Sequence, residues 1–227
     1  MQARLIESVE IAPEVRHFVF EAQGGRLDFV PGQFVSLTAP VGGKAITRAY
    51  SLASAPNEPR FELCLNRVAQ GHLSPFLFAM QPGDRIEMRP PLGQFVRRSP
   101  WRDSLLVAAG TGIAPFRSIL RAHLPGAPAS FTLLFGVRYE SNILYRQEFE
   151  ELAQGYANFR FWPTLTRPEP CWSGRRGRVQ MHLEEAIGAR RDLDVYICGL
   201  KEMVDSVRAL LKPMGFDRKQ IFHEKYD

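Results

Sequence analysis

The 227-residue sequence has few cysteines and no long apolar run. Its three cysteines, Cys64, Cys171 and Cys198, are widely spaced and form no C-x-x-C pair. We therefore expect no metal site or iron–sulfur cluster held by cysteines, and reduced thiols typical of a cytoplasmic protein. No stretch of about eighteen apolar residues occurs, and MQARLIESVEIAPEV at the N-terminus lacks the apolar segment of a signal peptide, so we expect no membrane span and no secretion.

The charge balance is basic, but the basic residues are scattered. Lysine and arginine number 29 against 24 aspartate and glutamate, a formal net charge of +5. Such a surface attracts anionic partners, which include phosphorylated cofactors, acidic proteins and nucleic acid. The densest group is Arg175, Arg176 and Arg178, close to Arg167. The arginines are not interleaved with aromatic residues along a stripe, so nucleic-acid binding is not expected.

The N-terminal part of the chain consists of short strand-like segments separated by breaks such as Pro31-Gly32 and Pro82-Gly83. This spacing predicts an antiparallel barrel or sandwich. Ser74 and Pro75 predict the N-cap and first position of one short helix, Ser74–Met80. The predicted strands are Arg4–Glu10, Val15–Glu21, Phe34–Thr38, Ala49–Leu52, Phe61–Val68 and Arg85–Arg89.

Strand-like and helix-like segments alternate in the rest of the chain. The alternation predicts a doubly wound α/β domain, a parallel sheet with helices on both faces and ligands at the carboxyl ends of its strands. The polar segment 97–103 predicts the boundary, so that residues 1–98 form a β-barrel domain and residues 103–227 the α/β domain. The predicted strands are Ser104–Ala109, Phe131–Val137, Phe159–Leu165, Asp194–Cys198 and Ile221–Lys225, and the predicted helices are Pro115–Leu124, Leu144–Leu152, His182–Ile187 and Met203–Leu211.

The first strand of the second half leads into the turn Gly110-Thr111-Gly112, followed by Pro115. Glycines let a backbone approach an anion closely, and a helix N-terminus offers N–H groups to a pyrophosphate. The spacing is G-x-G-x-x-P rather than the full G-x-G-x-x-G fingerprint. A tight strand–helix turn without a ligand explains the glycines equally well.

The stretch Arg48-Ala49-Tyr50-Ser51 has an unusual mixture of side chains for a strand. In an ideal strand Arg48 and Tyr50 share one face and Ser51 lies on the other. The stretch resembles the R-x-Y-S motif of the ferredoxin–NADP⁺ reductase superfamily. Six further motifs resemble those of the same superfamily, in its order and over nearly the whole chain. They are Phe29 with Pro31-Gly32-Gln33-Phe34, Gly71-His72-Leu73-Ser74, Pro91-Leu92-Gly93-Gln94-Phe95, Gly110-Thr111-Gly112-Ile113-Ala114-Pro115, Cys198-Gly199 with Met203, and Glu224-Lys225-Tyr226.

The resemblance implies that the barrel binds FAD. Tyr50 would then stack on the isoalloxazine ring, Arg48 would bind the FAD pyrophosphate, and Ser51 would lie near flavin N5. Aromatic faces suit flat rings and guanidinium groups suit phosphate oxygens. Gly71 and Ser74, with the N–H groups at the helix start, would hold the same pyrophosphate. The segment Leu65–Arg67 would line the flavin edge through its backbone, with Leu65 and Arg67 side chains in ordinary strand packing.

The resemblance also implies a pyridine-nucleotide site in the second domain. Cys198 and Glu224 would lie beside the nicotinamide with Ser51 opposite, as the catalytic residues, and Gly199 would bind the cofactor. By itself Cys198 would be a buried structural cysteine. Tyr226 would cover the flavin face on which the nicotinamide lands. The chain departs from the plant-type pattern here, because Asp227 follows the aromatic residue.

Arginines after the third predicted strand favour NADP over NAD, because they suit a 2′-phosphate. Thr166-Arg167 resembles the family's S-R motif for that phosphate, and Arg175 lies in the basic stretch that follows. We include Arg138 among the cofactor-binding residues. A solvated basic loop is the alternative explanation of these arginines, and Glu140 keeps NADH open.

The resulting hypothesis is a cytoplasmic, monomeric flavoenzyme that takes hydride from NADPH to FAD and passes electrons singly to a small acidic carrier, ferredoxin or flavodoxin. The basic net charge agrees with an acidic partner. One alternative is the NADH-dependent reductase component of a multi-component oxygenase, with its iron–sulfur centre on another chain. A second alternative is a non-catalytic FAD- and nucleotide-binding subunit of a larger complex. Such subunits carry a cysteine-rich cluster, which this sequence lacks.

Overall fold

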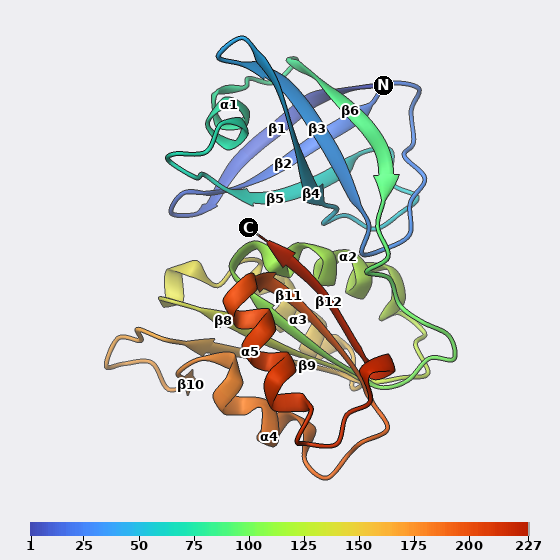
Figure 1. The fold of residues 1–227 in the computed structure, drawn as a ribbon, viewed down its shortest axis with the longest axis vertical. Helices are drawn as coiled ribbons and strands as arrows, with labels where there is room; N and C mark the ends of the chain where they lie inside the picture. Colours follow the sequence, from blue (N-terminus) through green and yellow to red (C-terminus); the bar gives the residue numbers. More distant parts are fainter. Residues whose placement is uncertain (227) are drawn as a thin grey trace. The chain divides into compact units, whose positions relative to one another are not determined.

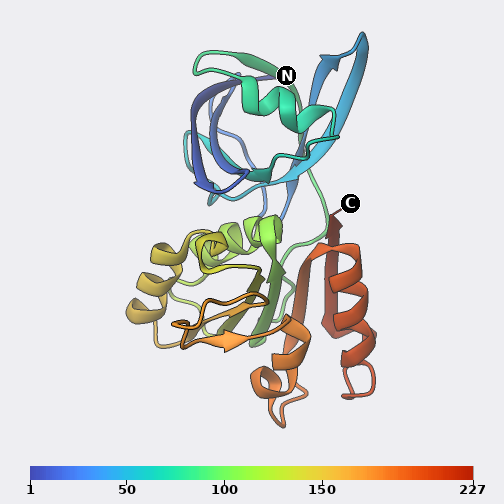
Figure 2. The ribbon, with the colours of Figure 1, turned by 90° about the vertical axis from the view of Figure 1, so that its left-hand side faces the viewer.

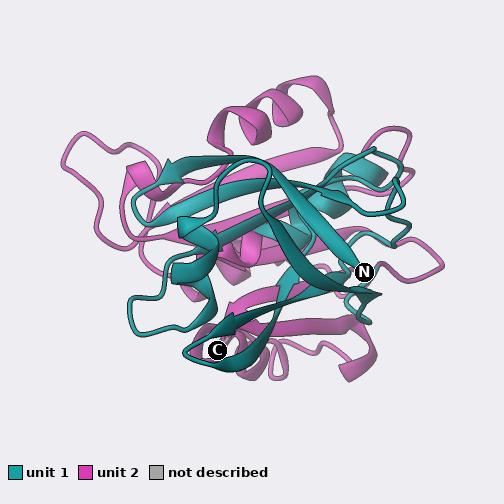
Figure 3. Cartoon of the chain, turned by 90° about the horizontal axis from the view of Figure 1, so that it is seen from above, with its two compact units in different colours: residues 1–96, 114–122 teal, residues 97–113, 123–227 magenta. Residues whose placement is uncertain are grey.

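The computed structural model describes residues 1–226 and divides the chain into two compact units. The first unit comprises Met1–Val96 together with Ala114–Ala122, and the second comprises 97–113 and the residues from His123 onward (Figure 3). The chain therefore passes between the units three times. All but the last residue of the ten-residue helix that follows the first strand of the second unit belong to the first unit.

The first unit is built on a six-stranded antiparallel sheet in the order β4-β3-β6-β1-β2-β5 (Figure 1). An isolated bridge between Leu52, just after β4, and Leu63, within β5, joins the two outer strands, which curls the sheet into a barrel. The predicted barrel is thus confirmed. Its elements are β1 (Gln2–Ala12), β2 (Val15–Ala22), β3 (Phe34–Val41), β4 (Lys44–Ser51), β5 (Phe61–Asn66), α1 (Leu73–Ala79) and β6 (Arg85–Leu92).

Alternating apolar residues fill the barrel. Phe18 and Phe20 on β2 are fully buried, as are Val35 and Leu37 on β3, in the pattern expected of strands with one face on a core. The Phe20 ring stacks on the Phe61 ring with centroids 5.5 Å apart, which joins β2 to β5.

The predicted start of helix α1 is wrong by one residue, and its predicted N-cap is also wrong. The helix begins at Leu73 after His72, which makes no side-chain cap hydrogen bond. The Ser74 hydroxyl instead accepts a hydrogen bond from the Val68 N–H at 3.0 Å, and the Gly71 N–H donates to the Val68 carbonyl at 2.8 Å. Ser74 therefore closes the loop that leads into the helix rather than capping the helix itself.

The second unit contains a six-stranded parallel sheet in the order β10-β9-β8-β7-β11-β12. Successive strands run outward from β7 to β10, and the chain then returns to add β11 and β12 on the other side. The point of reversal lies between β7 and β11, and the predicted doubly wound fold is confirmed. The strands are β7 (Ser104–Ala109), β8 (Phe131–Val137), β9 (Phe159–Leu165), β10 (Arg175–Arg176), β11 (Asp194–Leu200) and β12 (Ile221–Tyr226), and the helices are α2 (Ala114–His123), α3 (Arg146–Gly155), α4 (Leu183–Ile187) and α5 (Lys201–Leu211), with 3₁₀ turns at Gly110–Ile113, Glu140–Asn142, Val179–His182 and Arg218–Gln220.

Helices cover both faces of this sheet (Figure 2). Val107 and Ile197 on one face form a core with Val204 and Leu211 of α5, together with residues of α4. Phe149 of α3 packs on the opposite face, with its ring 5.3 Å from that of Phe161. Among the helices of residues 1–226, none has the length and apolar character needed to cross a bilayer.

Candidate functional site

The turn after β7 contacts the end of β11 so closely that only glycine fits. A Cβ on Gly112 would stand 2.6 Å from the carbonyl carbon of Cys198 and 2.9 Å from the Gly199 Cα. Both distances are far below van der Waals contact, so the absent side chain of Gly112 allows the two backbones to meet. The contact lies at the carboxyl ends of β7 and β11, where the strand order reverses and where open α/β sheets bind their ligands.

Two glycines near this contact, Gly110 and Gly199, adopt positive φ angles. Gly110 adopts a φ of 55°, which L residues seldom adopt. Gly199 adopts a φ of 151°, and a Cβ there would stand 2.8 Å from the Met203 Cε. Thr111 is half-buried between the two glycines, and Pro115 is buried in the first turn of α2. The motifs around Gly110 and Cys198 are thus parts of one contact.

Cys198, Glu224 and Tyr226 are brought together at the end of the sheet. Cys198 on β11 pairs with Glu224 on β12 in the parallel register, and its side chain is fully buried. Burial raises the pKa of the Cys198 thiol well above its ordinary value, the Glu224 charge raises it further, and a hydrogen bond with the Tyr226 side chain opposes the rise. The raised pKa favours the protonated thiol, which argues against a thiolate nucleophile at this position.

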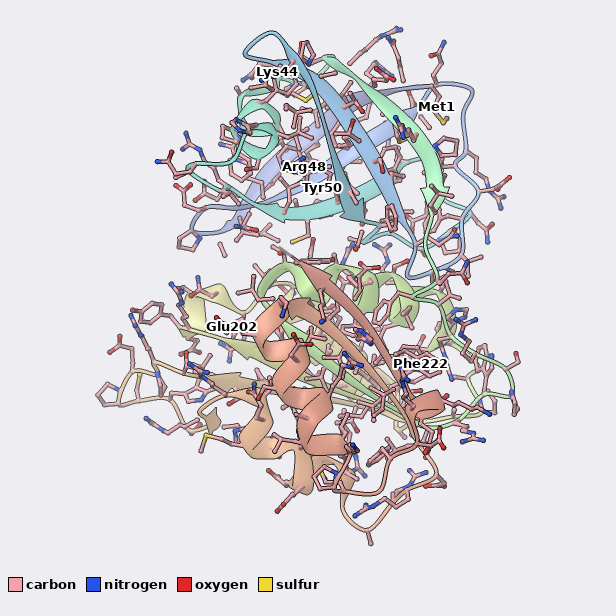
Figure 4. The ribbon with its side chains drawn as sticks, in the orientation of Figure 1. Met1, Lys44, Arg48, Tyr50, Glu202 and Phe222 are labelled. Carbon is pink, nitrogen blue, oxygen red and sulfur yellow. The ribbon has the colours of Figure 1, made fainter. Side chains whose placement is uncertain are left out.

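In the barrel, Arg48 and Tyr50 share one face of β4, as the sequence predicted (Figure 4). Their register partners are Leu37 and Val35 on β3, both fully buried. Tyr50 packs half-buried against the barrel core, and burial raises the pKa of its phenol to about 12. Arg48 is exposed and donates to the Thr47 carbonyl at 2.8 Å.

Ser51 is the last residue of β4 and is buried. It pairs with Phe34, next to the pair of Tyr50 and Val35, without a break in register. The alternation of the strand therefore continues to its end, and Ser51 lies on the face opposite to Tyr50. The pairing extends one residue further, because the Leu52 N–H donates to the Gln33 carbonyl at 2.9 Å.

The other predicted flavin residues lie at the end of β5 and in the loop that follows. Leu65 is buried in the barrel core. Arg67 is exposed, its N–H donates to the Glu14 carbonyl at 2.8 Å, and its guanidinium lies 3.9 Å from the Glu14 carboxylate. Gly71 in the loop lies beside Ser74 in the first turn of α1, since a Cβ on Gly71 would stand 3.2 Å from the Ser74 hydroxyl.

Positive φ angles and close neighbours explain why glycine occupies two positions in the proline-containing barrel motifs, Gly32 and Gly93. Gly32 adopts a φ of 99°, and a Cβ there would stand 3.0 Å from the Phe95 carbonyl carbon. Gly93 adopts a φ of 123° with the Phe34 ring 3.1 Å from such a Cβ. The entry motif with Gly32 and the exit motif with Gly93 therefore pack against each other.

Two of the predicted cofactor-binding arginines are exposed at the carboxyl edge of the sheet. Arg138 follows β8 and Arg167 follows β9, and the Arg167 N–H donates to the Arg138 carbonyl at 2.8 Å. The Arg167 guanidinium donates to the Tyr139 hydroxyl at 3.3 Å. Thr166, between the strand and Arg167, donates its N–H to the Val137 carbonyl at 3.0 Å. The two loops that carry the arginines are thus held side by side.

Arg175 is engaged elsewhere. It begins β10, a two-residue strand that the sequence pattern did not reveal. Its guanidinium donates to the two Glu185 carboxylate oxygens at 2.5 and 3.2 Å and lies 3.6 Å from the Trp162 ring centroid. These contacts hold the Arg175 guanidinium against α4 and β9.

Sequence reasoning missed one buried arginine. Arg117 on α2 is 7% exposed and bonds the Ala53 carbonyl and the Glu62 carboxylate. The sequence does not predict this burial, because the residues near Arg117 do not show that distant acceptors bind its guanidinium. Over residues 1–226, no group of three histidine, cysteine, aspartate or glutamate side chains is arranged to hold a metal ion.

Each half of the chain matches a known protein family. A family described as "Oxidoreductase FAD-binding domain" matches residues 2–96, and one described as "Oxidoreductase NAD-binding domain" matches residues 106–209. The sequence is 44% identical to ferredoxin--NADP reductase B of Sorangium cellulosum, over 100% of this chain and 97% of that protein. It is 29% identical to the toluate 1,2-dioxygenase electron transfer component of Pseudomonas putida, over 88% of this chain and 60% of that protein.

Among solved structures, the fold is similar to that of a ferredoxin NADP⁺ reductase from Neisseria gonorrhoeae with bound FAD and NADP. The TM-score is 0.88 at 25% identity, over 99% of this chain and 98% of that one. A relative at 44% identity over nearly its full length, together with the two matching domain families, shows that this chain belongs to the ferredoxin–NADP⁺ reductase family of flavin-dependent oxidoreductases.

Proposed function

We propose that the protein transfers hydride from NADPH to FAD and passes the electrons singly to a small acidic carrier, ferredoxin or flavodoxin. The observation that carries the proposal is the contact of Gly112 with Cys198 and Gly199 at the reversal point of the parallel sheet. This is the place at which such sheets bind nucleotides. The similarity over the full chain to a ferredoxin–NADP reductase supports the same activity.

The barrel residues fit FAD. Tyr50 offers a half-buried aromatic face, and stacking on a flat ring would complete its burial. Arg48, on the same face, donates to a neutral carbonyl, so its positive charge is available to a phosphate oxygen. Ser74 and Gly71 shape the loop at the start of α1, where backbone N–H groups would meet the same pyrophosphate. We propose that Ser51 lies at the flavin edge, although it is on the other face of β4.

The second unit fits a pyridine nucleotide. We propose that the pyrophosphate binds the N–H groups of the turn Gly110–Ile113, and that Cys198, Glu224 and Tyr226 surround the nicotinamide. When bound, FAD and the nucleotide supply the hydride chemistry. The protein's part is to orient the rings and exclude water. A neutral, buried Cys198 gives the nicotinamide an uncharged surface, and the Tyr226 hydrogen bond fixes that thiol.

The arginines support NADPH as the donor. Arg138 and Arg167 are exposed on neighbouring loops at the carboxyl edge of the sheet, which suits a 2′-phosphate. Glu140, the residue that could bind a 2′-hydroxyl instead, is paired with Arg146 at 2.5 Å. We therefore assign the phosphate to Arg138 and Arg167, with Thr166 beside them, and we assign Arg175 a role in holding the loop.

The net charge of the protein and its sequence relatives support an acidic protein as the electron carrier. The formal net charge of +5 favours encounter with an acidic protein. The second candidate is the reductase component of an oxygenase, favoured by the similarity to the toluate dioxygenase component. This chain spans 60% of that relative, so the comparison supports only the shared flavin and nucleotide domains. We also propose that the protein is a monomer.

The test is a side-by-side measurement of dye reduction with NADPH and NADH, followed by reduction of purified ferredoxin and flavodoxin. We expect purified protein to contain FAD, to use NADPH with the higher kcat/KM, and to reduce at least one acidic carrier. A protein that takes up no FAD contradicts the flavoenzyme assignment. A preference for NADH contradicts the assignment of Arg138 and Arg167.

A further inference from the structure

Helix α2 is the first helix after the nucleotide-binding turn, yet it packs on the barrel. The chain continues from the turn Gly110–Ile113 directly into Ala114, and Ala114–Ala122 belongs to the same compact unit as the barrel. Phe116 meets Phe95 edge to face at 5.7 Å, and Ile119 faces Gly32, where a Cβ would stand 3.5 Å from the isoleucine methyl group. The apolar face of α2 thus lies on the entry and exit segments of the barrel.

Arg117 adds a polar connection within this apolar contact. Its side chain is 8% exposed. One nitrogen of its guanidinium, Nη1, donates to the Ala53 carbonyl at 3.0 Å and also binds the Glu62 carboxylate. A buried guanidinium loses hydration and must be paired, and these two partners pair its Nη1 group.

The partners of Arg117 belong to the segment that follows the R-x-Y-S motif. Ala53 lies two residues after Ser51, and its N–H donates to the Glu62 carbonyl at 2.8 Å. The Glu62 N–H donates to the hydroxyl of Ser54, which is fully buried. The end of the flavin motif, strand β5 and Arg117 are therefore joined by a continuous set of hydrogen bonds.

Arg121, one turn further along α2, shares only part of this arrangement. It donates to the Glu62 carboxylate at 3.2 Å and to the Glu58 carboxylate at 3.0 Å, and its side chain is 31% exposed. Its hydrogen bonds go to these two carboxylates and not to the Ala53 carbonyl. Glu62 also lies 3.9 Å from His17. Glu62 thus keeps a cationic partner when either arginine is removed.

We infer that Arg117 is a positioning residue for hydride transfer, because it joins the segment carrying the flavin motif to the helix that begins with the nucleotide-binding turn. The inference rests on the proposed function, since it assumes that FAD and NADPH bind at those two places. Arg117 touches neither. Its bond to Ala53 fixes where α2 starts relative to Tyr50 and Ser51, and small displacements of reacting groups are costly in rate.

The test compares Arg117→Met with Arg121→Met. Methionine keeps much of the aliphatic volume, and Glu62 retains its other arginine in each variant. Arg121→Met also removes the ion pair with the partly exposed Glu58, so the control loses more charge pairing than Arg117→Met does. The measurements are FAD content, dissociation constants of NADP⁺, and the rate of flavin bleaching at saturating NADPH by stopped-flow absorbance. For Arg117→Met we expect normal FAD content, NADP⁺ affinity within about threefold, and hydride transfer slower by about tenfold or more. For Arg121→Met we expect hydride transfer within about twofold of wild type, because the Ala53 bond is intact.

Three results would overturn the inference: unchanged hydride transfer in Arg117→Met, equal slowing in both variants, or slowing that follows loss of FAD. Arg117→Lys serves where the methionine variant folds poorly, because lysine keeps the charge but lacks the planar guanidinium. It is expected to give an intermediate rate with full FAD content, and a wild-type rate would contradict the inference. A wild-type protein whose FAD is not reduced by NADPH would instead contradict the proposed function.

Discussion

Gly112 and Cys198 are in backbone contact, with the position of a Cβ on Gly112 only 2.6 Å from the Cys198 carbonyl carbon. Since the neighbour is backbone rather than a flexible side chain, Gly112→Ala should push the turn away from β11. We expect a loss of about 1–3 kcal/mol in unfolding free energy, as for other overpacked sites. We also expect weaker NADP⁺ binding, measured by titration calorimetry. Gly155→Ala is the control, because a Cβ there meets nothing within 4 Å. If both variants bind NADP⁺ like wild type, the turn is not the pyrophosphate site.

We expect Tyr50 to bind FAD through the face of its ring and not through its hydroxyl. Tyr50→Phe should retain FAD, whereas Tyr50→Ala should lose stacking worth about 0.5–1.5 kcal/mol beyond the buried area. FAD release during dialysis, followed by absorbance, measures the difference. Equal retention by the alanine variant would show that the ring does not stack on the cofactor.

Arg167 and Arg175 have different partners and should behave differently. Arg167→Ala should raise KM for NADPH roughly tenfold or more with little change for NADH, because a charge-assisted bond to phosphate contributes about 1.5–3 kcal/mol. Arg175→Ala breaks contacts with Glu185 and Trp162 and should affect both nucleotides alike. Steady-state kinetics with the two donors separates the outcomes. An Arg167→Ala enzyme that loses affinity for both donors equally would remove the 2′-phosphate assignment.

Arg97 is the first residue of the second unit, and its guanidinium contacts two aromatic rings of that unit. Its guanidinium carbon lies 4.3 Å from the Trp101 ring centroid and 4.5 Å from that of Phe131. Arg97→Ala should lower the unfolding free energy by about 0.5–2 kcal/mol, measured by urea denaturation. Arg98→Ala should cost less, because its guanidinium carbon is 5.7 Å from the Phe222 centroid. The reverse order would mean that the ring contacts of Arg97 do not stabilise the fold.

The lowered pKa of the Glu62 carboxyl predicts how the stability of the protein depends on pH. Burial alone raises the pKa of its carboxyl, but Arg117, His17 and Arg121 together hold the pKa below the ordinary value of 4.5. A lowered folded-state pKa stabilises the protein above the unfolded value and loses that contribution as pH falls through the folded value. The stability difference between wild type and Glu62→Gln should therefore shrink as pH falls through 4.5 and below it.

Urea denaturation across this pH range, for both proteins, measures that difference. Glu21→Gln is the control, because Glu21 pairs with Arg4 on the surface, where solvent screens the charges. A difference that does not shrink in acid would show that the Glu62 charge contributes nothing to the folded state.

Apolar runs and turn residues were sufficient to predict most of the architecture. The bounds of Ser104–Ala109, Phe131–Val137 and Phe159–Leu165 match β7, β8 and β9. Central parallel strands are buried on both faces, so their apolar runs have clear ends. The glycine spacing likewise indicated the turn at Gly110, because that backbone path depends on local conformation.

Tertiary contacts decided the rest. The Ser74 hydroxyl is bound to Val68 rather than to its own helix, and Arg175 is bound to Glu185, ten residues away. The assignment of α2 to the barrel unit, and the burial of Arg117 against Ala53, join residues more than sixty positions apart. Sequence periodicity reports which face of an element is buried, but not which partner covers it. The sequence therefore determined the family, the two folds and the cofactor motifs, while the partner of each polar side chain followed only from three-dimensional packing.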